Sequence, residues 1–138
     1  MPEELGHALG IVPVFVGKNQ FDYLVEVESE EILRNLHPDY ARIRSLPVRG
    51  VIVTSRATTP GFDFMSRFFA PRVGVNEDPV TGSSHCCLAP YWSEKLGKND
   101  LVAYQASIRG GELRLNLQGE RVLICGQAVT VFKTELEC

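Results

Sequence analysis

The chain has 138 residues, of which 44% are hydrophobic and 22% are charged, a balance typical of one soluble globular domain. Its net charge is -3 and its basic residues do not cluster, which argues against binding to nucleic acid or to an anionic membrane surface. The apolar runs have the length of a strand and fall short of the roughly 20 residues that a membrane-spanning helix needs. The first residues do not resemble a signal peptide, so the expected location is cytoplasmic.

The first half of the chain predicts strands and short helices. Strands are expected over 11–16, 23–27, 50–55 and 62–69, with turns at 17–19 and 59–61. Ser29 is a good N-cap for a short helix that stops before Pro38, and 40–46 predicts another helical turn. The stretch from the last of these strands to Gly82 is expected to be irregular.

The last third of the chain predicts an antiparallel meander. Its strands are expected over 102–109, 112–118, 121–125 and 128–134. Gly110-Gly111 is a strong signal for a two-residue hairpin because both positions tolerate a positive φ. Gly119-Glu120 predicts the next turn. Alternating leucines at 113, 115 and 117 indicate one buried and one exposed face.

Residues 84–96 predict a helix at the centre of the fold. Apolar side chains fall on nearly every side of its helical wheel, so the helix is expected to be buried rather than amphipathic, and Gly97 ends it. Pro90 in its interior predicts a bend or a short first segment. Many strands and few helices indicate an α+β domain in which a curved, mainly antiparallel sheet wraps around this central buried helix.

The segment before this helix carries the candidate site. Hydroxyl groups of Thr81, Ser83 and Ser84 can cap the first amides of the helix, and Gly82 lets a ligand approach the backbone. These amides and the helix dipole favour a carboxylate or a phosphate. Asp78, held extended by the following proline, faces the same region and could hold the ammonium group of an amphoteric substrate. The alternative is that the hydroxyl groups only cap the helix.

Other candidate residues have two interpretations each. His85, in the first helical turn, could stabilise a ligand anion, or it packs locally. Cys86 and Cys87 lie where a thiol pKa is lowered, but their apolar helix favours a role as small core residues. Arg67 either presents its guanidinium to the site or belongs to a strand with alternating burial.

The sequence gives little support for a metal site or a disulfide framework. Cysteines stand at 86, 87, 125 and 138 without a CxxC pair, and reduced thiols are expected. His7 and His37 have no cysteine or second histidine at ligand spacing. No metal and no cofactor are therefore predicted.

Two segments, 63–71 and 74–85, resemble the signature of the PhzF family of phenazine biosynthesis proteins. The second contains Glu77-Asp78-Pro79-Val80-Thr81-Gly82-Ser83. The resemblance continues through Pro90-Tyr91-Trp92 and the meander, and it looks nearest to the family's animal members, the phenazine biosynthesis-like domain-containing proteins. The family is similar to diaminopimelate epimerase in fold, with two lobes and a site between the N-termini of their central helices.

The resemblance implies that residues 1–138 form a single C-terminal lobe whose N-terminal lobe is absent. Members of the phenazine pathway are isomerases that move a proton without a metal, a cofactor or a cysteine. Asp78 and Ser83 would then be the catalytic residues. Binding of a small carboxylate-bearing substrate would involve Thr81, Gly82, Ser83, Ser84 and His85.

Two departures from the family pattern affect the expected activity. The main acid/base of the family, a glutamate, comes from the opposite lobe, and Glu77 belongs to the signature and does not replace it. Val80 stands where the epimerase branch has a cysteine, so a two-cysteine racemase is not expected. The chain is predicted to be half of an isomerase that is inactive alone. The alternative is a truncated, non-catalytic interaction module, because a single lobe exposes surface and strand edges to a homodimer or another protein.

Overall fold

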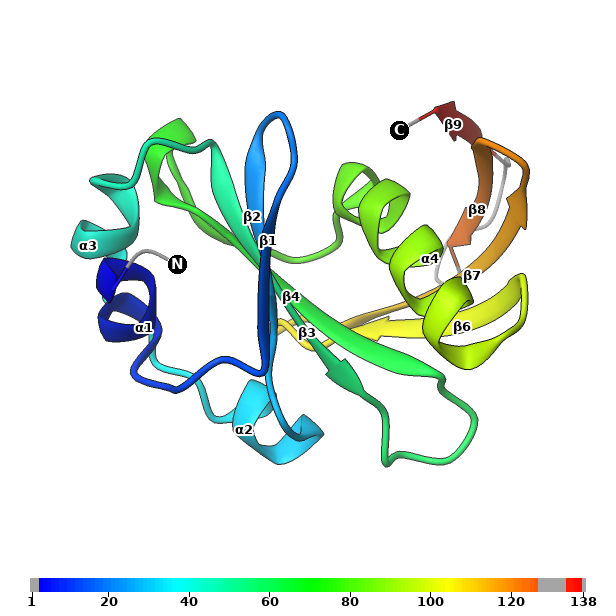
Figure 1. The fold of residues 1–138 in the computed structure, drawn as a ribbon, viewed down its shortest axis with the longest axis horizontal. Coiled ribbons are helices and arrows are strands. Elements are labelled where there is room, and N and C mark those ends of the chain that lie inside the picture. Colours follow the sequence, from blue (N-terminus) through cyan, green and yellow to red (C-terminus); the bar gives the residue numbers. More distant parts are fainter. Residues whose placement is uncertain (1–2, 127–133, 138) are drawn as a thin grey trace.

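The computed structural model of the chain describes residues 3–126 and 134–137, and Figure 1 shows the fold. Within these residues, nine strands form one sheet in the order β1-β2-β3-β4-β6-β7-β8-β9, and β5 pairs with β4 off this path. The strands are β1 (Phe15–Lys18), β2 (Asp22–Glu26), β3 (Gly50–Arg56), β4 (Phe64–Ala70), β5 (Val75–Asp78), β6 (Asp100–Gln105), β7 (Gly111–Gln118), β8 (Arg121–Gly126) and β9 (Thr134–Glu137). The helices are α1 (Glu3–Leu9), α2 (Glu30–Arg34), α3 (Tyr40–Arg44) and α4 (Gly82–Leu96), with a 3-10 turn, η1, at Pro71–Val73. None of the helices in this part of the chain is both long and apolar enough to cross a membrane.

The sheet is mixed and mainly antiparallel. Among the described strands, β2–β3 and β4–β6 pair in parallel, and the other neighbours pair antiparallel. Parallel neighbours need a crossover, which α2 and α3 provide between β2 and β3, and β5 and α4 provide between β4 and β6. The α+β class is therefore confirmed.

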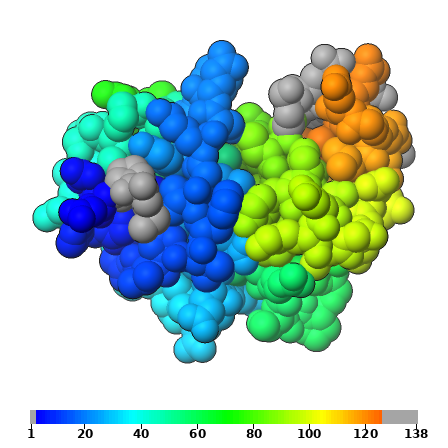
Figure 2. All heavy atoms as spheres, viewed as in Figure 1, coloured from blue at the N-terminus to red at the C-terminus, as the bar shows by residue number. Residues whose placement is uncertain are grey.

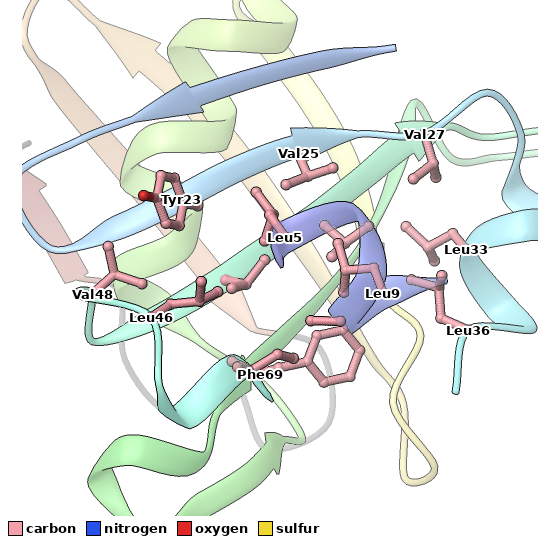
Figure 3. Packing of buried hydrophobic residues seen from close by; sticks show 14 of the residues in the cluster. Leu5, Leu9, Tyr23, Val25, Val27, Leu33, Leu36, Leu46, Val48 and Phe69 are labelled. Atoms are coloured by element: carbon pink, nitrogen blue, oxygen red, sulfur yellow. The ribbon is translucent and has the colours of Figure 1, made fainter. Parts of the chain in front are cut away.

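The central strands β3 and β4 separate two hydrophobic cores. Successive side chains of a strand point to opposite faces, so Met65 and Phe69 of β4 lie in one core. Phe64 and Phe68 lie in the other. Figure 3 shows side chains of α1, α2 and the strands converging in the first core. Helix α1, which was not predicted from the sequence, contributes the fully buried Leu5 to this core.

Helix α4 fills the second core. It packs against β6, β7 and β8, which curve around it in Figure 1. Trp92 is fully buried on its inner side, and its ring stacks on that of Phe64 with the centroids 5.7 Å apart. The expectation that α4 is buried on nearly every side is wrong, because its outer side is exposed at Ser83, Pro90 and Glu94. The helix is thus amphipathic.

Pro90 does not divide α4. The helix runs unbroken from Gly82 to Leu96, so the predicted short first segment is not found. Pro90 lies on the exposed side, where water can replace the one helical hydrogen bond that a proline removes. Gly97 follows with φ 70°, and its N–H donates to the carbonyl of Ser93, which confirms the predicted end of the helix.

The turn between β1 and β2 lies later than predicted. β1 continues through Lys18, so the turn occupies 19–21 instead of 17–19. The side-chain oxygen of Asn19 accepts the N–H groups of Phe21 at 2.8 Å and Asp22 at 2.7 Å. An asparagine that bonds the backbone two and three residues on replaces the glycine-based turn that the sequence suggested.

The stretch expected to be irregular before α4 contains regular structure. After η1, Gly74 has φ 93° and reverses the chain, so that β5 pairs antiparallel with β4. A glycine accepts this left-handed conformation without strain. Asp78 is the last residue of β5.

The connection between β6 and β7 also differs from the prediction. It is the loop 106–110, with Gln105 paired to Gly111, and not a two-residue hairpin at Gly110-Gly111. The next turn, at Gly119-Glu120, is confirmed by the pairing of Gln118 with Arg121. The strand predicted over 128–134 lies outside the described residues except at Thr134, where β9 begins.

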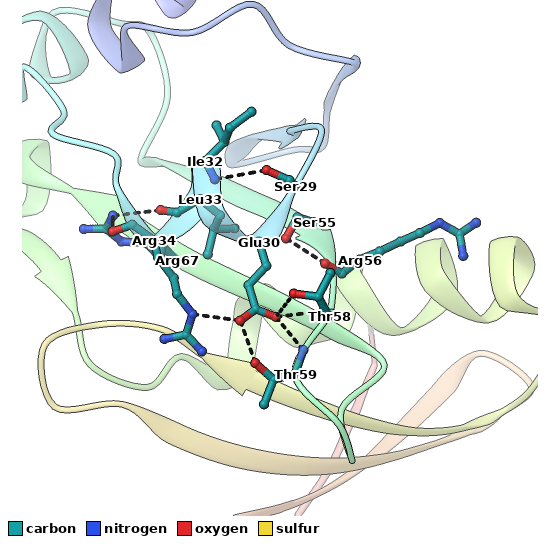
Figure 4. A network of polar contacts seen from close by, with 10 residues as sticks. All are labelled: Ser29, Glu30, Ile32, Leu33, Arg34, Ser55, Arg56, Thr58, Thr59 and Arg67. Carbon is teal, nitrogen blue, oxygen red and sulfur yellow. Dashed lines mark hydrogen bonds and ion pairs between the residues drawn. The ribbon is translucent and has the colours of Figure 1, made fainter.

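Glu30 joins α2 to the segment after β3 (Figure 4). Ser29 caps this helix as predicted, with its hydroxyl oxygen 3.1 Å from the amide nitrogen of Ile32. The Glu30 carboxylate accepts bonds from the backbone and hydroxyl groups of Thr58 and Thr59, and from Arg34. Burial alone would raise the pKa of Glu30, but these hydrogen bonds outweigh it and lower the pKa to about 2.

Candidate functional site

The segment from Asp78 to Thr81 turns between β5 and α4, and Gln105 of β6 holds it. The amide nitrogen of Gln105 donates to the carbonyl of Asp78 at 2.9 Å and to the hydroxyl of Thr81 at 3.0 Å. Its amide oxygen accepts the N–H of Thr81 at 2.8 Å. Gln105 is fully buried, so water does not compete for these bonds and the turn is fixed in one conformation.

The carboxylate of Asp78 is oriented by Thr81. The hydroxyl oxygen of Thr81 is 2.6 Å from Oδ2 of Asp78. Because this hydroxyl accepts a bond from Gln105, its own hydrogen is directed to Asp78. Asp78 is half-buried, and its Oδ1 bonds no group in the described part of the chain. One oxygen of the aspartate is therefore held and the other remains available.

The loop between β6 and β7 also contacts this turn. The hydroxyl of Ser107 donates to the carbonyl of Pro79 at 2.9 Å and accepts the N–H of Gly110 at 3.0 Å. A Cβ atom on Gly111 would lie 2.4 Å from a methyl carbon of Val80, closer than real contacts allow. This loop is longer than the predicted two-residue turn, and it packs against the segment that follows Asp78.

The first turn of α4 is not capped by hydroxyl groups as the sequence predicted. Thr81 is the N-cap residue, but its hydroxyl bonds Asp78 and caps no amide. The hydroxyl of Ser84 donates to the carbonyl of Thr81 at 3.0 Å. The amides of Gly82 and Ser83 are therefore left without a side-chain cap among the described residues. Amides of this kind, at the positive end of a helix dipole, favour an anion.

His85 lies in the core beneath the turn. Its Nδ1 is 2.6 Å from the carbonyl oxygen of Thr81, and its ring lies 6.1 Å from that of Phe64. Burial lowers the pKa of His85 to about 4, although the bond to Thr81 opposes this shift. The neutral ring donates from Nδ1 and holds the Thr81 carbonyl, and it presents no surface to a ligand in this arrangement.

Ser83 is exposed at the start of α4, beside Arg49. Nη2 of Arg49 is 3.3 Å from the hydroxyl oxygen of Ser83 and 2.7 Å from a carboxylate oxygen of Asp22. Figure 2 shows the β1–β2 hairpin, in blue, projecting beside the green atoms of α4. The side chain of Asn19, in the turn of this hairpin, bonds Cys87 in the second turn of α4, so the hairpin lies near the end of α4 that carries Ser83.

Arg67 does not reach this site. On β4 it shares a face with Met65 and Phe69, opposite to α4. Its guanidinium bonds the carboxylate of Glu77 at 2.8 and 2.9 Å. It also donates to carbonyl oxygens at the end of α2, including that of Leu33 in Figure 4. The interpretation of Arg67 as a ligand-binding cation is wrong, and so is the expected alternation of burial, because all seven residues of β4 are buried.

The two adjacent cysteines take different positions on α4. Cys86 is buried in the second core, as expected of a small core residue. Cys87 is half-buried, and its sulfur accepts a bond from the side-chain amide of Asn19 at 2.7 Å. Within residues 3–126 and 134–137, no three His, Cys, Asp or Glu side chains gather as the ligands of a metal ion would.

The family model of phenazine biosynthesis-like proteins (PhzC-PhzF) matches residues 4–134. The chain belongs to this family. An uncharacterized isomerase of Halalkalibacterium halodurans is 57% identical over 135 residues, which are 98% of this chain and 51% of that protein. The mouse phenazine biosynthesis-like domain-containing protein 2 is 49% identical over 112 residues, or 78% of this chain and 39% of that protein. Identity is thus higher to this bacterial protein than to this animal one.

Solved structures of PhzF proteins share the fold of the whole chain. A crystal structure of a PhzF-family protein from Enterococcus faecalis has a TM-score of 0.88 and 36% sequence identity, and the match covers 100% of this chain and 52% of that one. A PhzC/PhzF protein from Clostridium difficile gives a TM-score of 0.84 at 39% identity, again over 100% of this chain and 52% of that one. The chain spans about half the length of the relatives that match it over nearly all its residues.

Sequence reasoning missed the side chains that position this PhzF-family site. Gln105, Arg49 and Asp22 lie far from Asp78 in the chain, and each belongs to a strand or a loop with no recognisable motif. The sequence offered one signal for Gln105, a polar side chain at the end of a strand that is mostly apolar. Its burial could not be inferred without knowing that β6 lies beside β4.

Proposed function

We propose that the chain is one half of a cofactor-independent isomerase that transfers a proton on a small, carboxylate-bearing metabolite. The observation that carries this proposal is the oriented carboxylate of Asp78, 2.6 Å from the hydroxyl of Thr81, beside the uncapped start of α4. Relatives at 57% and 56% identity bear the name isomerase, which supports the reaction class. The location we propose is the cytoplasm.

Each part of the site has a role in this proposal. The amides of Gly82 and Ser83 bind the carboxylate of the substrate at the positive end of α4. Oδ1 of Asp78 faces the reacting part of the substrate and relays a proton or orients the ammonium or hydroxyl group. Thr81, Ser84 and His85 act on the turn: Thr81 holds Asp78, while Ser84 and His85 both bond the carbonyl of Thr81.

The second acid/base group comes from another lobe in this proposal. Asp78 alone cannot remove a proton from one face of a carbon and return it at another position. We assign the missing group to a glutamate of an N-terminal lobe, which would face α4 as in a diaminopimelate-epimerase-like arrangement. The proposal agrees with the twofold greater length of the relatives, of which this chain covers about half. The chain alone should then be inactive.

A specific observation favours the alternative of an interaction module. Among the strands that the structure describes, β1 lies at an edge of the sheet, and apolar side chains on and before it are exposed, among them Val12, Val14 and Phe15. An unpaired edge with apolar side chains invites a second copy of the chain or another protein. In this alternative the chain works through contacts and performs no chemistry.

Light scattering combined with deuterium wash-in separates the two proposals. The purified chain is incubated in D2O with a panel of amino and hydroxy acids, and incorporation is read by mass spectrometry. The half-enzyme proposal expects no incorporation by the chain alone and incorporation once an N-terminal lobe is supplied. A dimer that exchanges substrate protons without that lobe would contradict it. A folded assembly that stays inert even with the lobe would favour the interaction module.

A further inference from the structure

Arg49 lies directly before β3, beside the first turn of α4, and its guanidinium is held in one orientation. Nε and Nη2 donate to the two carboxylate oxygens of Asp22 at 3.1 and 2.7 Å. Asp22 is 2% exposed, so this bidentate pair is partly shielded from water and strongly directional. The rings of Phe21 and Phe68 lie 5.4 and 5.6 Å from the guanidinium carbon and restrict it further.

The backbone places this ion pair next to α4. Asp22 of β2 pairs in parallel with Gly50 of β3, so the residue before Gly50 lies beside the carboxylate. Asn19, in the turn before Asp22, donates its side-chain amide to the sulfur of Cys87 on α4 at 2.7 Å. The hairpin, the start of β3 and the start of α4 are thus joined through polar contacts.

The geometry fixes the role of the Ser83 hydroxyl. Nη2 of Arg49 carries two hydrogens, one for Asp22 and one that reaches the oxygen of Ser83 at 3.3 Å. A guanidinium only donates, so Ser83 must accept this bond, and its own hydrogen is free to be donated. Ser83 is exposed, and its hydroxyl donates to no acceptor among the described residues.

We propose that Arg49 is a positioning residue that makes Ser83 a hydrogen-bond donor to the carboxylate of the bound substrate. This inference rests on the proposed function, because it concerns the same site. Ser83 does not act as a base here, since its oxygen is engaged by a cation. Asp22 balances the charge of Arg49, so the amides at the positive end of α4 and the Ser83 hydroxyl are what select a carboxylate over a neutral group of the same shape.

Titration of the 15N-labelled chain with acetate, and with acetamide as a neutral probe of similar shape, tests this inference. Binding is followed by the amide resonances of Gly82 and Ser83. We expect acetate to bind and acetamide not to bind. Arg49→Met should weaken acetate binding about tenfold, because the Ser83 hydroxyl is then no longer oriented as a donor to acetate. Arg42→Met is the control, because Arg42 of α3 forms an exposed ion pair with Asp39, the residue that caps this helix.

The Ser83→Ala variant shows whether Arg49 acts through Ser83. If it does, Arg49→Met causes little further loss of acetate affinity in the Ser83→Ala background. Arg49→Lys keeps the charge but not the planar fork, and its affinity should fall between those of the wild type and Arg49→Met. An equal loss in both backgrounds would overturn the positioning role.

The outcomes separate this inference from the proposed function. Unchanged acetate affinity in folded Arg49→Met and Arg49→Lys variants overturns the inference and leaves the isomerase proposal standing. No acetate binding to the wild type overturns the inference and also removes the carboxylate site from the proposed function. The expected loss in Arg49→Met, with no proton exchange by the two-lobed protein, would support the inference and contradict the isomerase.

Discussion

The hydroxyl of Thr81 donates to the carboxylate of Asp78 across 2.6 Å, and the same hydroxyl accepts a bond from Gln105. Thr81, which was predicted to cap the helix with its hydroxyl, thus orients the carboxylate of Asp78 instead. The three side chains form a short chain of hydrogen bonds that runs from the buried end of β6 to the half-exposed carboxylate. Substitutions along this chain test whether it orients Asp78.

Gln105→Leu should destabilise the fold by about 2–3 kcal/mol, because it leaves the buried N–H of Thr81 without an acceptor. Urea denaturation of the variant and the wild type measures the difference. Gln118→Leu, at an exposed position of β7, is the matched control and should change stability little. Equal effects at both positions would show that Gln105 does not hold the turn.

Gly111→Ala should destabilise the fold by about 1–3 kcal/mol, because the new methyl group overlaps the side chain of Val80. Val80→Ala removes the overlapping atoms, so the double variant should recover part of the loss. A double-mutant cycle by chemical denaturation measures this coupling. If the free-energy changes of the two single variants simply add in the double variant, Gly111 and Val80 are not in contact.

His85 should be neutral at pH 7, with the proton on Nδ1, which carbon and nitrogen shifts of the labelled ring report. Its pKa is lowered to about 4, below the ordinary value of 6.5, so the unfolded chain takes up a proton first as the pH falls. Its contribution to stability is therefore present above about pH 6.5 and lost between 6.5 and 4. His85→Gln should show a smaller loss over this range. A protonated ring at pH 6 in the folded chain would contradict this assignment.

Glu30 should contribute to acid sensitivity in a lower pH range. Its pKa is lowered from 4.5 to about 2, so its stabilising effect is complete above pH 4.5 and is lost as the pH falls toward 2. Glu30→Gln should be less stable than the wild type at pH 7, with a difference that shrinks toward pH 2. Glu31→Gln, next to it on α2, is the control. A constant difference across the range would show that the ionised carboxylate is not what Thr58 and Thr59 bind.

Some local features of the fold could be predicted from the sequence, although the turn that Asn19 forms was not among them. The caps of α2 and the end of α4 depend on neighbouring residues, and Ser29 and Gly97 act as predicted. Features that depend on contacts between residues far apart in the chain could not be predicted. The loop before Gly111 packs on Val80, which lies about 30 residues earlier in the chain. The side chain of Arg67 points toward α2 because this helix packs on that face of β4.

The candidate site was predicted in the same uneven way. The segment from Asp78 to Ser83 was recognisable because its motif is continuous. The hydroxyl of Thr81 was assigned to the wrong partner, since Asp78 and the helix amides compete for it and only the position of Gln105 decides the outcome. Arg49 could not be placed beside Ser83 before the parallel pairing of β2 and β3 was known.

Deuterium wash-in by a two-lobed protein tests the central claim most directly. This chain replaces the matching half of the H. halodurans isomerase, and incorporation into a panel of amino and hydroxy acids is compared for the wild type, Asp78→Asn and the exposed control Asp100→Asn. Our account predicts that Asp78→Asn lowers the exchange rate about 100-fold or more at nearly unchanged stability, and that the control has no effect. Exchange at an undiminished rate in Asp78→Asn would remove this aspartate from the mechanism.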